Sequence, residues 1–327
     1  MSKQVKIAVR AIFVAMLAAM LLVFSACAAT QQDEGDDVES ITIGTLVTED
    51  ILPLWLAEEE GLFNANGMIV HIQTFQSAQE LTVAITSGEV DMAMTDPMVA
   101  ASLVAGGTDV SLEWVTLGAT ANQGRFGIMT SPQSGIKTLS DLAGKPIGVG
   151  SNTILEYVMD KLMQQAGVPD DQIMTEEIKK LPVRYEMMAS NQIAAAVLPG
   201  SLLALGEATG NLLVADDSQG ENLSQSVMIA RTAFTATDSG EKALAKLSTI
   251  WDLAVEMINA NPSSYRPLLA EKASLPDPVR DSYQVSSYPQ AARPTSQMID
   301  PILEWMRQKD YLTVDLHYDA ATGLFVK

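Results

Sequence analysis

The chain has 327 residues, of which 40 are acidic and 20 are basic, so its formal net charge is −20. Such an excess of negative charge opposes binding to nucleic acid and to anionic lipid and favours solubility, so a nucleic-acid-binding role is excluded. The length is sufficient for two ordinary domains, each with its own hydrophobic core.

Residues 1–26 have the pattern of a secretory signal peptide. Three basic residues precede an apolar run at residues 11–24, and the small residues Ser25 and Ala26 follow it. The run has 14 residues, fewer than the roughly 20 that a membrane-spanning helix needs, so we expect a cleaved signal rather than a permanent span. Because the segment contains three basic and no acidic residues, its removal lowers the net charge from −20 to −23.

Cys27 is the only cysteine of the chain and directly follows Phe24, Ser25 and Ala26. This position resembles a bacterial lipobox, in which the cysteine is diacylated and becomes the mature N-terminus. A lone thiol in an exported protein has no disulfide partner, so we expect lipidation of Cys27; an ordinary cleavage site that happens to include a cysteine is the alternative. Residues 27–40 are then the lipidated cysteine and a disordered tether, because they are small, polar and acidic and have little to bury.

Strand and helix patterns alternate in the next part of the chain. Apolar and β-branched runs predict strands at residues 40–47, 68–75, 90–95, 112–119 and 126–130. Apolar periodicity, with proline or a capping residue at the start and glycine at the end, predicts helices at residues 53–63, 78–87 and 96–106. This alternation predicts an α/β lobe with a parallel sheet covered on both faces. The first crossover to another lobe is expected near the turn-rich residues 131–135.

The same alternation repeats in the middle of the chain. The predicted strands are residues 145–149, 173–179 and 193–198, and the predicted helices are residues 152–166, 185–191 and 201–206. A short apolar run at 227–230 is expected to cross back, and amphipathic helices at 241–260 and 299–309 are expected to pack mainly on the first lobe. We therefore assign residues 41–124 and 226–327 to the first lobe, and residues 125–225 to the second.

Five segments, in order, carry a resemblance to a known family: PLWLAEEEGLF, VHIQTF, ELTVAITSGEVDMAMTDPMVAASLVAGG, TLSDLAGKPIGVGSNTILEYVMDKLMQQAGV and ASNQIAAAVLPG. Together they resemble the solute-binding proteins for sulfonates, taurine, nitrate and thiamine pyrimidine precursors, over residues 41–230. The resemblance implies a two-lobed periplasmic-binding-protein fold of type II, with two crossover strands and a ligand cleft between the lobes. It also implies an exported protein, held at the membrane by lipidated Cys27, that delivers its ligand to the permease and ATPase of an ABC importer.

The position of the cleft also follows from the predicted sheets. Open parallel sheets bind ligands beyond the carboxyl ends of their strands, where helix N-termini present exposed N–H groups. These loops, together with the aligned aromatic position and the first crossover, contain the candidate ligand-binding residues, which are Thr45, Asp50, Trp55, Gln76, Ser77, Thr95, Asp96, Asn122, Arg125, Ser151, Asn152 and Thr153.

The resemblance also points to Trp55 and Thr45, of which Thr45 already lies in one of these loops. Both align with aromatic residues that line the cleft in pyrimidine-binding relatives, and in Thr45 a small hydroxyl takes the aromatic position. A tryptophan on an apolar helix face, such as Trp55, also fits a place in the core.

The candidate residues point to two kinds of ligand. Residues 151–153 at a helix start suit an anionic or polar group, and Arg125 suits a sulfonate or carboxylate. Glu49, Asp50 and Asp96 suit a ligand with N–H groups or positive charge. Helix capping by Asp96 or residues 151–153, and a surface ion pair of Arg125, are the alternatives. We therefore expect a small polar or heterocyclic ligand whose charge stays open.

Two other functions use a similar chain. Relatives of this fold that synthesise a pyrimidine rely on histidine and a cysteine-rich motif, whereas residues 27–327 contain only His71, His317 and Cys27 of these types. The sequence has no metal-ligand cluster, nucleophile elbow or phosphate-binding glycine loop, so we expect neither catalysis nor a metal or cofactor. Signalling through a receptor remains an alternative, because it needs the same mobile clamp. We expect a monomer.

Overall fold

The computed structural model describes residues 39–219 and 222–327. The predicted signal peptide, lipidation site and nearly all of the predicted tether lie outside these residues. The first described element, β1 (Glu39–Leu46), begins two residues inside the range that we assigned to the tether. Within the described part of the chain, no helix is both long and apolar enough to cross a membrane.

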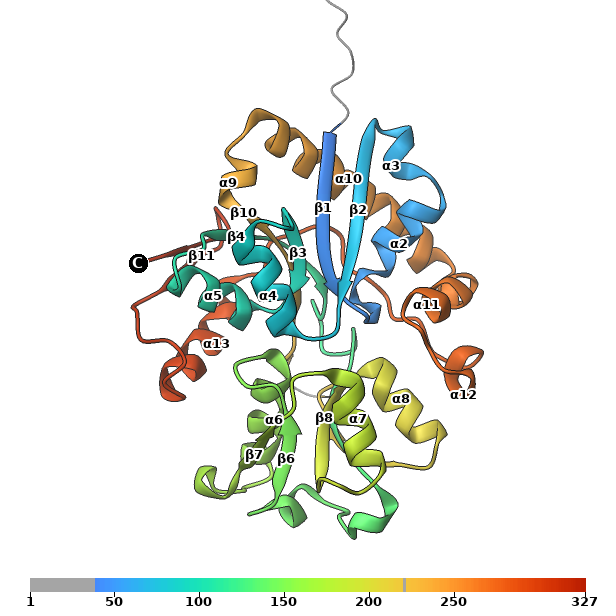
Figure 1. The fold of residues 1–327 in the computed structure, drawn as a ribbon, viewed down its shortest axis with the longest axis vertical. Helices are drawn as coiled ribbons and strands as arrows, with labels where there is room; N and C mark the ends of the chain where they lie inside the picture. Colours follow the sequence, from blue (N-terminus) through green and yellow to red (C-terminus); the bar gives the residue numbers. More distant parts are fainter. Residues whose placement is uncertain (1–38, 220–221) are drawn as a thin grey trace, which may run out of the picture. The chain divides into compact units, whose positions relative to one another are not determined.

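A seven-stranded sheet, in the order β11-β12-β4-β10-β3-β1-β2, forms the first lobe (Figure 1). Its further strands are β2 (Met68–Phe75), β3 (Met92–Thr95), β4 (Val110–Leu117), β10 (Ser226–Arg231), β11 (His317–Asp319) and β12 (Leu324–Val326). Strand β1 pairs in parallel with β2 and β3, as predicted. The prediction of a parallel sheet was wrong at β10, which lies antiparallel between β3 and β4. This strand arrives from the second sheet without the helical crossover that a parallel connection requires.

Helices cover both faces of this sheet, as predicted. They are α2 (Leu52–Glu59), α3 (Leu62–Ala65), α4 (Ala78–Ser87), α5 (Pro97–Ala105), α9 (Thr232–Thr235), α10 (Asp238–Ala260), α11 (Arg266–Lys272), α12 (Asp277–Arg280) and α13 (Ser296–Gln308), with the short turns η1 (Glu49–Ile51) and η5 (Pro262–Tyr265). Side chains of β10 alternate between two cores. Val227 and Ile229 pack with α4, α5 and α13, and Met228 and Ala230 pack with α2 and α10.

The second lobe is a five-stranded sheet in the order β7-β6-β8-β5-β9. Its strands are β5 (Phe126–Thr130), β6 (Pro146–Val149), β7 (Met174–Glu177), β8 (Ala195–Pro199) and β9 (Leu212–Asp216). Its helices are α6 (Ile154–Gln165), α7 (Leu181–Ala189) and α8 (Gly200–Ala208), with short turns η2 (Pro132–Ser134), η3 (Leu139–Leu142) and η4 (Asp170–Gln172). Strand β6 is parallel to β7 and β8, whereas β5 is antiparallel to β8 and β9.

The chain passes between the two sheets twice. It leaves the first sheet after β4 to enter β5, and it returns from β9 to β10. In Figure 1 the first lobe therefore combines blue segments with orange and red ones, whereas the second is green to yellow. The two-lobed α/β architecture with two crossovers is confirmed, but the first crossover was expected near residues 131–135 and lies at residues 118–125, because β5 already belongs to the second sheet.

Candidate functional site

A cavity of about 370 Å³ is lined by residues of both lobes. Most of the lining comes from the carboxyl ends of β1, β3, β6, β7 and β8, from the loops that follow them and from helices α4 to α7, whereas Phe126 and Ser226 line the cavity from the starts of β5 and β10. Cavities of this size hold small molecules. The carboxyl-end rule therefore located the cavity correctly.

Half of the predicted site residues line this cavity. They are Asp50, Thr95, Asp96, Ser151, Asn152 and Thr153. The structure also brings residues there that sequence reasoning missed, among them Ser102, Glu177, Lys179, Arg184 and Ser226. Ser226 opens the predicted return strand β10, so the crossover itself was the signal that would have found it.

The visible contacts of three other predicted residues are structural. Thr45 is fully buried and its hydroxyl donates to the carbonyl of Leu46 at 3.0 Å. Trp55 is 2% exposed and packs in the core beside α10. Ser77 caps α4, since its Oγ accepts from the N–H of Glu80 at 3.2 Å. A ligand-binding role for these residues stays a prediction.

The remaining three are not among the residues that line this cavity. Gln76 lines a neighbouring cavity of about 330 Å³. Asn122, in the first crossover, accepts a hydrogen bond from the hydroxyl of Thr120 at 2.6 Å. Arg125 forms ion pairs with Glu207 at 2.8 Å and Asp216 at 2.6 Å, and these carboxylates hold its pKa above the usual range. The guanidinium of Arg125 is thus already engaged by carboxylates.

Asp96 connects helices of the two lobes. It is the N-cap of α5, where its Oδ1 accepts from the N–H of Val99 at 2.9 Å. Its Oδ2 accepts from the N–H of Ile154, the first residue of α6, at 3.2 Å. Only 6% of the residue is exposed, and this burial raises the pKa of Asp96 to about 6 against the opposing effect of its hydrogen bonds. The capping alternative is confirmed, and the same carboxylate lines the cavity.

Carboxylates also occupy the N–H groups that precede α6. The N–H and hydroxyl of Ser151 both donate to Glu177 Oε2, the former at 2.9 Å. The N–H of Asn152 donates to Glu156 Oε2 at 2.7 Å. Thr153 stands at the N-cap position, but its hydroxyl donates to the carbonyl of Gly150 at 2.7 Å instead of capping the helix. The positive end of α6 is therefore already neutralised by acidic side chains.

Asn152 is held in an unusual conformation. Its φ of 56° lies in the left-handed region, which asparagine tolerates better than most residues. Its Nδ2 donates to Ser102 Oγ of the first lobe at 2.7 Å, and its Oδ1 is buried without a hydrogen-bond partner. A strained backbone and an unsatisfied acceptor beside a cavity are typical of a functional position.

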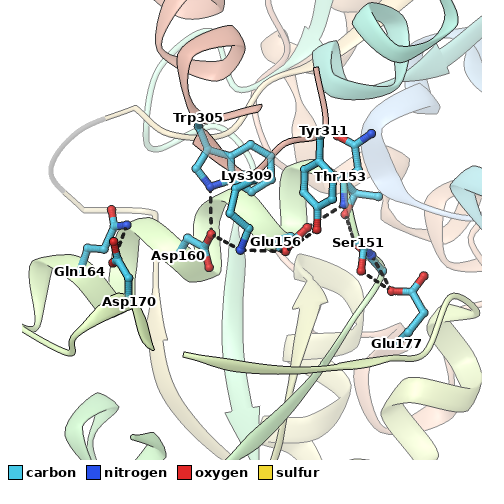
Figure 2. A network of polar contacts seen from close by, with 12 residues as sticks. Ser151, Thr153, Glu156, Asp160, Gln164, Asp170, Glu177, Trp305, Lys309 and Tyr311 are labelled. Atoms are coloured by element: carbon cyan, nitrogen blue, oxygen red, sulfur yellow. Dashed lines mark hydrogen bonds and ion pairs between the residues drawn. The ribbon is translucent and has the colours of Figure 1, made fainter. Parts of the chain in front are cut away.

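Glu156 links the start of α6 to the C-terminal helix (Figure 2). The ammonium of Lys309 lies 3.2 Å from Glu156 Oε1 and 3.0 Å from Asp160 Oδ2. Trp305 Nε1 donates to Asp160 at 2.9 Å, and the Tyr311 hydroxyl donates to Glu156 at 3.0 Å. Because α13 packs on α5 of the first lobe, this network is a second connection between the lobes.

Asp50 and Glu49 are neighbouring buried acids. Asp50 is 4% exposed and accepts from the hydroxyls of Ser226 at 2.7 Å and Thr48 at 2.6 Å. Burial raises the pKa of Asp50. Glu49 accepts from the hydroxyl of Tyr283 at 3.0 Å, and burial together with the charge of Asp50 raises its pKa to about 7.

The basic residues of the cavity wall are engaged as well. Arg184 is 2% exposed and donates to the carbonyls of Ile178 at 2.8 Å and Val197 at 3.0 Å, while burial lowers its pKa to about 10. Lys179 lies 3.8 Å from Glu177. The predicted helix began at residue 185, whereas α7 begins at Leu181, so the sequence placed Arg184 before the helix that carries it.

No group of histidine, cysteine and acidic side chains in residues 39–219 and 222–327 is arranged to hold a metal ion. His71 lies on β2 and His317 on β11, and both are exposed.

Comparison with known proteins identifies the family. The model of the NMT1/THI5 like family matches residues 48–264. A search of the curated proteins finds no match.

Solved structures share the fold. The alkanesulfonate-binding protein SsuA from Xanthomonas axonopodis pv. citri, bound to MOPS, has a TM-score of 0.70 at 17% identity over 84% of this chain and 95% of its own. The aliphatic sulphonate-binding protein SsuA from Escherichia coli gives 0.68 at 15% identity over 84% and 89%. The nitrate-binding protein NrtA from Synechocystis PCC 6803 gives 0.68 at 13% identity over 85% and 83%.

At these identities the structural likenesses establish a shared fold, and the family model, which spans more than half of the sequence, establishes kinship. The two-lobed α/β chain belongs to the NMT1/THI5-like family.

Proposed function

We propose that this chain is the solute-binding component of an ABC importer, which captures a small polar or heterocyclic molecule outside the cytoplasm and delivers it to the permease and ATPase. Family membership supports this, as do the similar solved structures of sulfonate- and nitrate-binding proteins. We propose that the chain binds its ligand without catalysis and that it is a monomer, anchored to the membrane through lipidated Cys27.

One observation carries the proposal: the cavity lies between two lobes that hydrogen-bond across it. Asp96 of the first lobe accepts from Ile154 of the second, and Asn152 of the second donates to Ser102 of the first. A ligand that contacts both walls stabilises this closed arrangement by its higher affinity for it. Residues 41–124 and 226–327 form one jaw of this clamp, and residues 125–225 form the other.

The test is a ligand screen on the exported protein purified in mild detergent. Sulfonates, nitrate, pyrimidines and amines are added while the melting temperature is followed by intrinsic tryptophan fluorescence. A ligand that binds only the folded state and is present at 100 times its Kd stabilises the folded protein by about 2.7 kcal/mol. We expect one class to raise the melting temperature, and calorimetry to give one site per chain.

Two neighbouring variants on α4 locate the site. Thr82 lines the cavity, whereas Val83 is 63% exposed. Thr82→Trp fills the cavity and is expected to abolish the ligand-induced shift, and Val83→Trp is expected to retain it. Equal binding by both variants would remove this cavity as the site, and absence of binding by every class would contradict a solute-binding role.

A further inference from the structure

The charge of the solute is the question that the sequence left open, and the contacts of the cavity wall bear on it. Two carboxylates, Asp50 and Asp96, line the cavity and are 4% and 6% exposed. Their visible partners are hydroxyl and backbone N–H groups, and within the described residues neither carboxylate forms an ion pair with a basic side chain. A buried carboxylate without a counter-charge is costly, so this wall favours a positively charged occupant.

Three of the N–H groups that would hold an oxyanion at the start of α6 are already in use. At the start of α6, Ser151 donates to Glu177, Asn152 to Glu156 and Ile154 to Asp96. A sulfonate or nitrate at this helix end would have to displace three carboxylates. The helix end therefore offers little to an anion, although its residue types suit one.

The basic residues do not reverse this balance. Arg125 forms ion pairs with two carboxylates, and it is not one of the described residues that line the cavity. Arg184 lines it, but its guanidinium donates to the carbonyls of Ile178, Val197 and Lys179. Lys179 lies beside Glu177.

An unsatisfied acceptor points the same way. Asn152 lines the cavity, and its Oδ1 is buried with no partner while its Nδ2 is committed to Ser102. A buried acceptor without a donor costs stability, and a ligand N–H would satisfy it. This acceptor therefore suits a ligand that carries N–H groups.

We propose that the solute carries a protonated nitrogen group with N–H donors, such as an ammonium, an amidinium or a protonated amino-heterocycle, which binds against Asp50 and Asp96. This inference rests on the proposed solute-binding function and specifies the cargo of the same cavity. A simple oxyanion such as nitrate or an alkanesulfonate is not the cargo.

Calorimetry on the exported, purified protein tests the charge with probes of similar shape. Benzylamine, benzamidine and 4-aminopyrimidine are compared with benzenesulfonate and nitrate, and benzyltrimethylammonium separates charge from N–H donation. We expect at least one N–H-bearing probe to bind, with the trimethylated cation weaker, because it lacks donors for Asp50, Asp96 and Asn152.

Variants test the two carboxylates. Asp50→Asn and Asp96→Asn keep shape and hydrogen-bonding capacity but remove charge, and each is expected to weaken binding of the nitrogen probe about 10- to 100-fold, the loss expected for a hydrogen bond to a charged group. Glu89→Gln is the control, since Glu89 is an exposed carboxylate of the same lobe that does not line the cavity. A cooperative melting transition of each ligand-free variant shows that it is folded.

The outcomes separate this inference from the proposed function. Binding of benzenesulfonate or nitrate without any nitrogen probe would overturn the inference while leaving solute binding intact. Equal affinities of wild type and both aspartate variants would also overturn it. Failure of every probe would count against solute binding by this cavity, and the inference would fall with it.

Discussion

Asp96 serves two hydrogen-bonding groups at once, the N–H groups of Val99 in α5 and Ile154 in α6. Its contribution to stability as a helix cap can be separated from that of its charge, because serine also caps helices but is uncharged. We expect Asp96→Ala to be less stable than Asp96→Ser by about 1 kcal/mol, the usual contribution of an N-cap. Urea unfolding of the ligand-free proteins at pH 5 measures this difference. Equal midpoints for the two variants would mean that the cap contributes nothing here.

Glu49 makes the stability of the protein depend on pH. Burial and the charge of Asp50 raise its pKa from 4.5 to about 7. Between these values the folded chain holds a proton that the unfolded chain releases, so the contribution of Glu49 to stability falls as the pH rises from about 4.5 to about 7.

Removal of this charge should stabilise the protein at alkaline pH. Glu49→Gln keeps an acceptor for the Tyr283 hydroxyl and removes the ionisable group. We expect the variant to exceed the wild type by on the order of 2 kcal/mol at pH 8 and to converge with it near pH 5. Melting temperatures at the two pH values measure the effect. A constant difference across pH would assign the cost to something other than ionisation.

The packing of α13 against the second lobe depends on charge. Glu156 and Asp160 of α6 are 1% and 3% exposed, and Lys309, which directly follows α13, is the cation that faces both (Figure 2). We expect Lys309→Met to cost about 2–3 kcal/mol, because two buried carboxylates then lose their counter-charge, with part of the loss relieved by solvent near the half-buried lysine. Lys242→Met, at an exposed position of α10, should stay within about 0.5 kcal/mol. Urea unfolding of both variants measures the two losses of stability. Equal losses would show that the ion pairs of Lys309 contribute no more than an exposed lysine does.

Where the local sequence pattern was strong, it was sufficient to predict the bounds of a helix or strand. The predicted helix 78–87 and strands 68–75 and 126–130 coincide with α4, β2 and β5. The missed strands, β9 and the pair β11 and β12, have only three to five residues each and are partly exposed, so short apolar runs such as residues 212–215 were not sufficient to predict them. Their pairing depends on partners far away in the sequence, such as Leu324 with Ser111.

The site was predictable by position more than by chemistry. The carboxyl-end rule located Asp50, Asp96 and residues 151–153 in the cavity. It did not reveal that Glu177 and Glu156 occupy the donors of α6, because Glu177 lies on another strand and Glu156 appears in the sequence as an ordinary helix residue. Arg184 was missed for the same reason, since its three carbonyl partners meet only in the folded lobe.

At the scale of the whole molecule, contacts between the two lobes should affect the affinity for the ligand. The hydrogen bond from Asn152 to Ser102 joins the lobes, so it contributes only when they are closed. We expect Ser102→Ala and Asn152→Ala each to weaken ligand binding by about 1 kcal/mol, roughly fivefold, and the double variant to lose less than the sum. Calorimetry gives the affinities, and the unliganded melting temperature is the control. Strictly additive losses would show that the two residues act separately.

The final prediction concerns attachment to the membrane. A single acyl chain gives only marginal binding, whereas two chains hold a protein stably, so diacylation of Cys27 would suffice even for a chain whose negative charge is repelled by anionic lipid. We expect the wild type to partition with membranes, to incorporate labelled palmitate and to be released by detergent. Cys27→Ser should be recovered in the soluble exported fraction or retained as uncleaved precursor, without label, and Ser25→Ala serves as a control that keeps the thiol and a small residue beside it. A wild type that is exported, soluble and free of label would show that the segment is an ordinary cleavage site, and the proposed importer component would then diffuse freely to its permease.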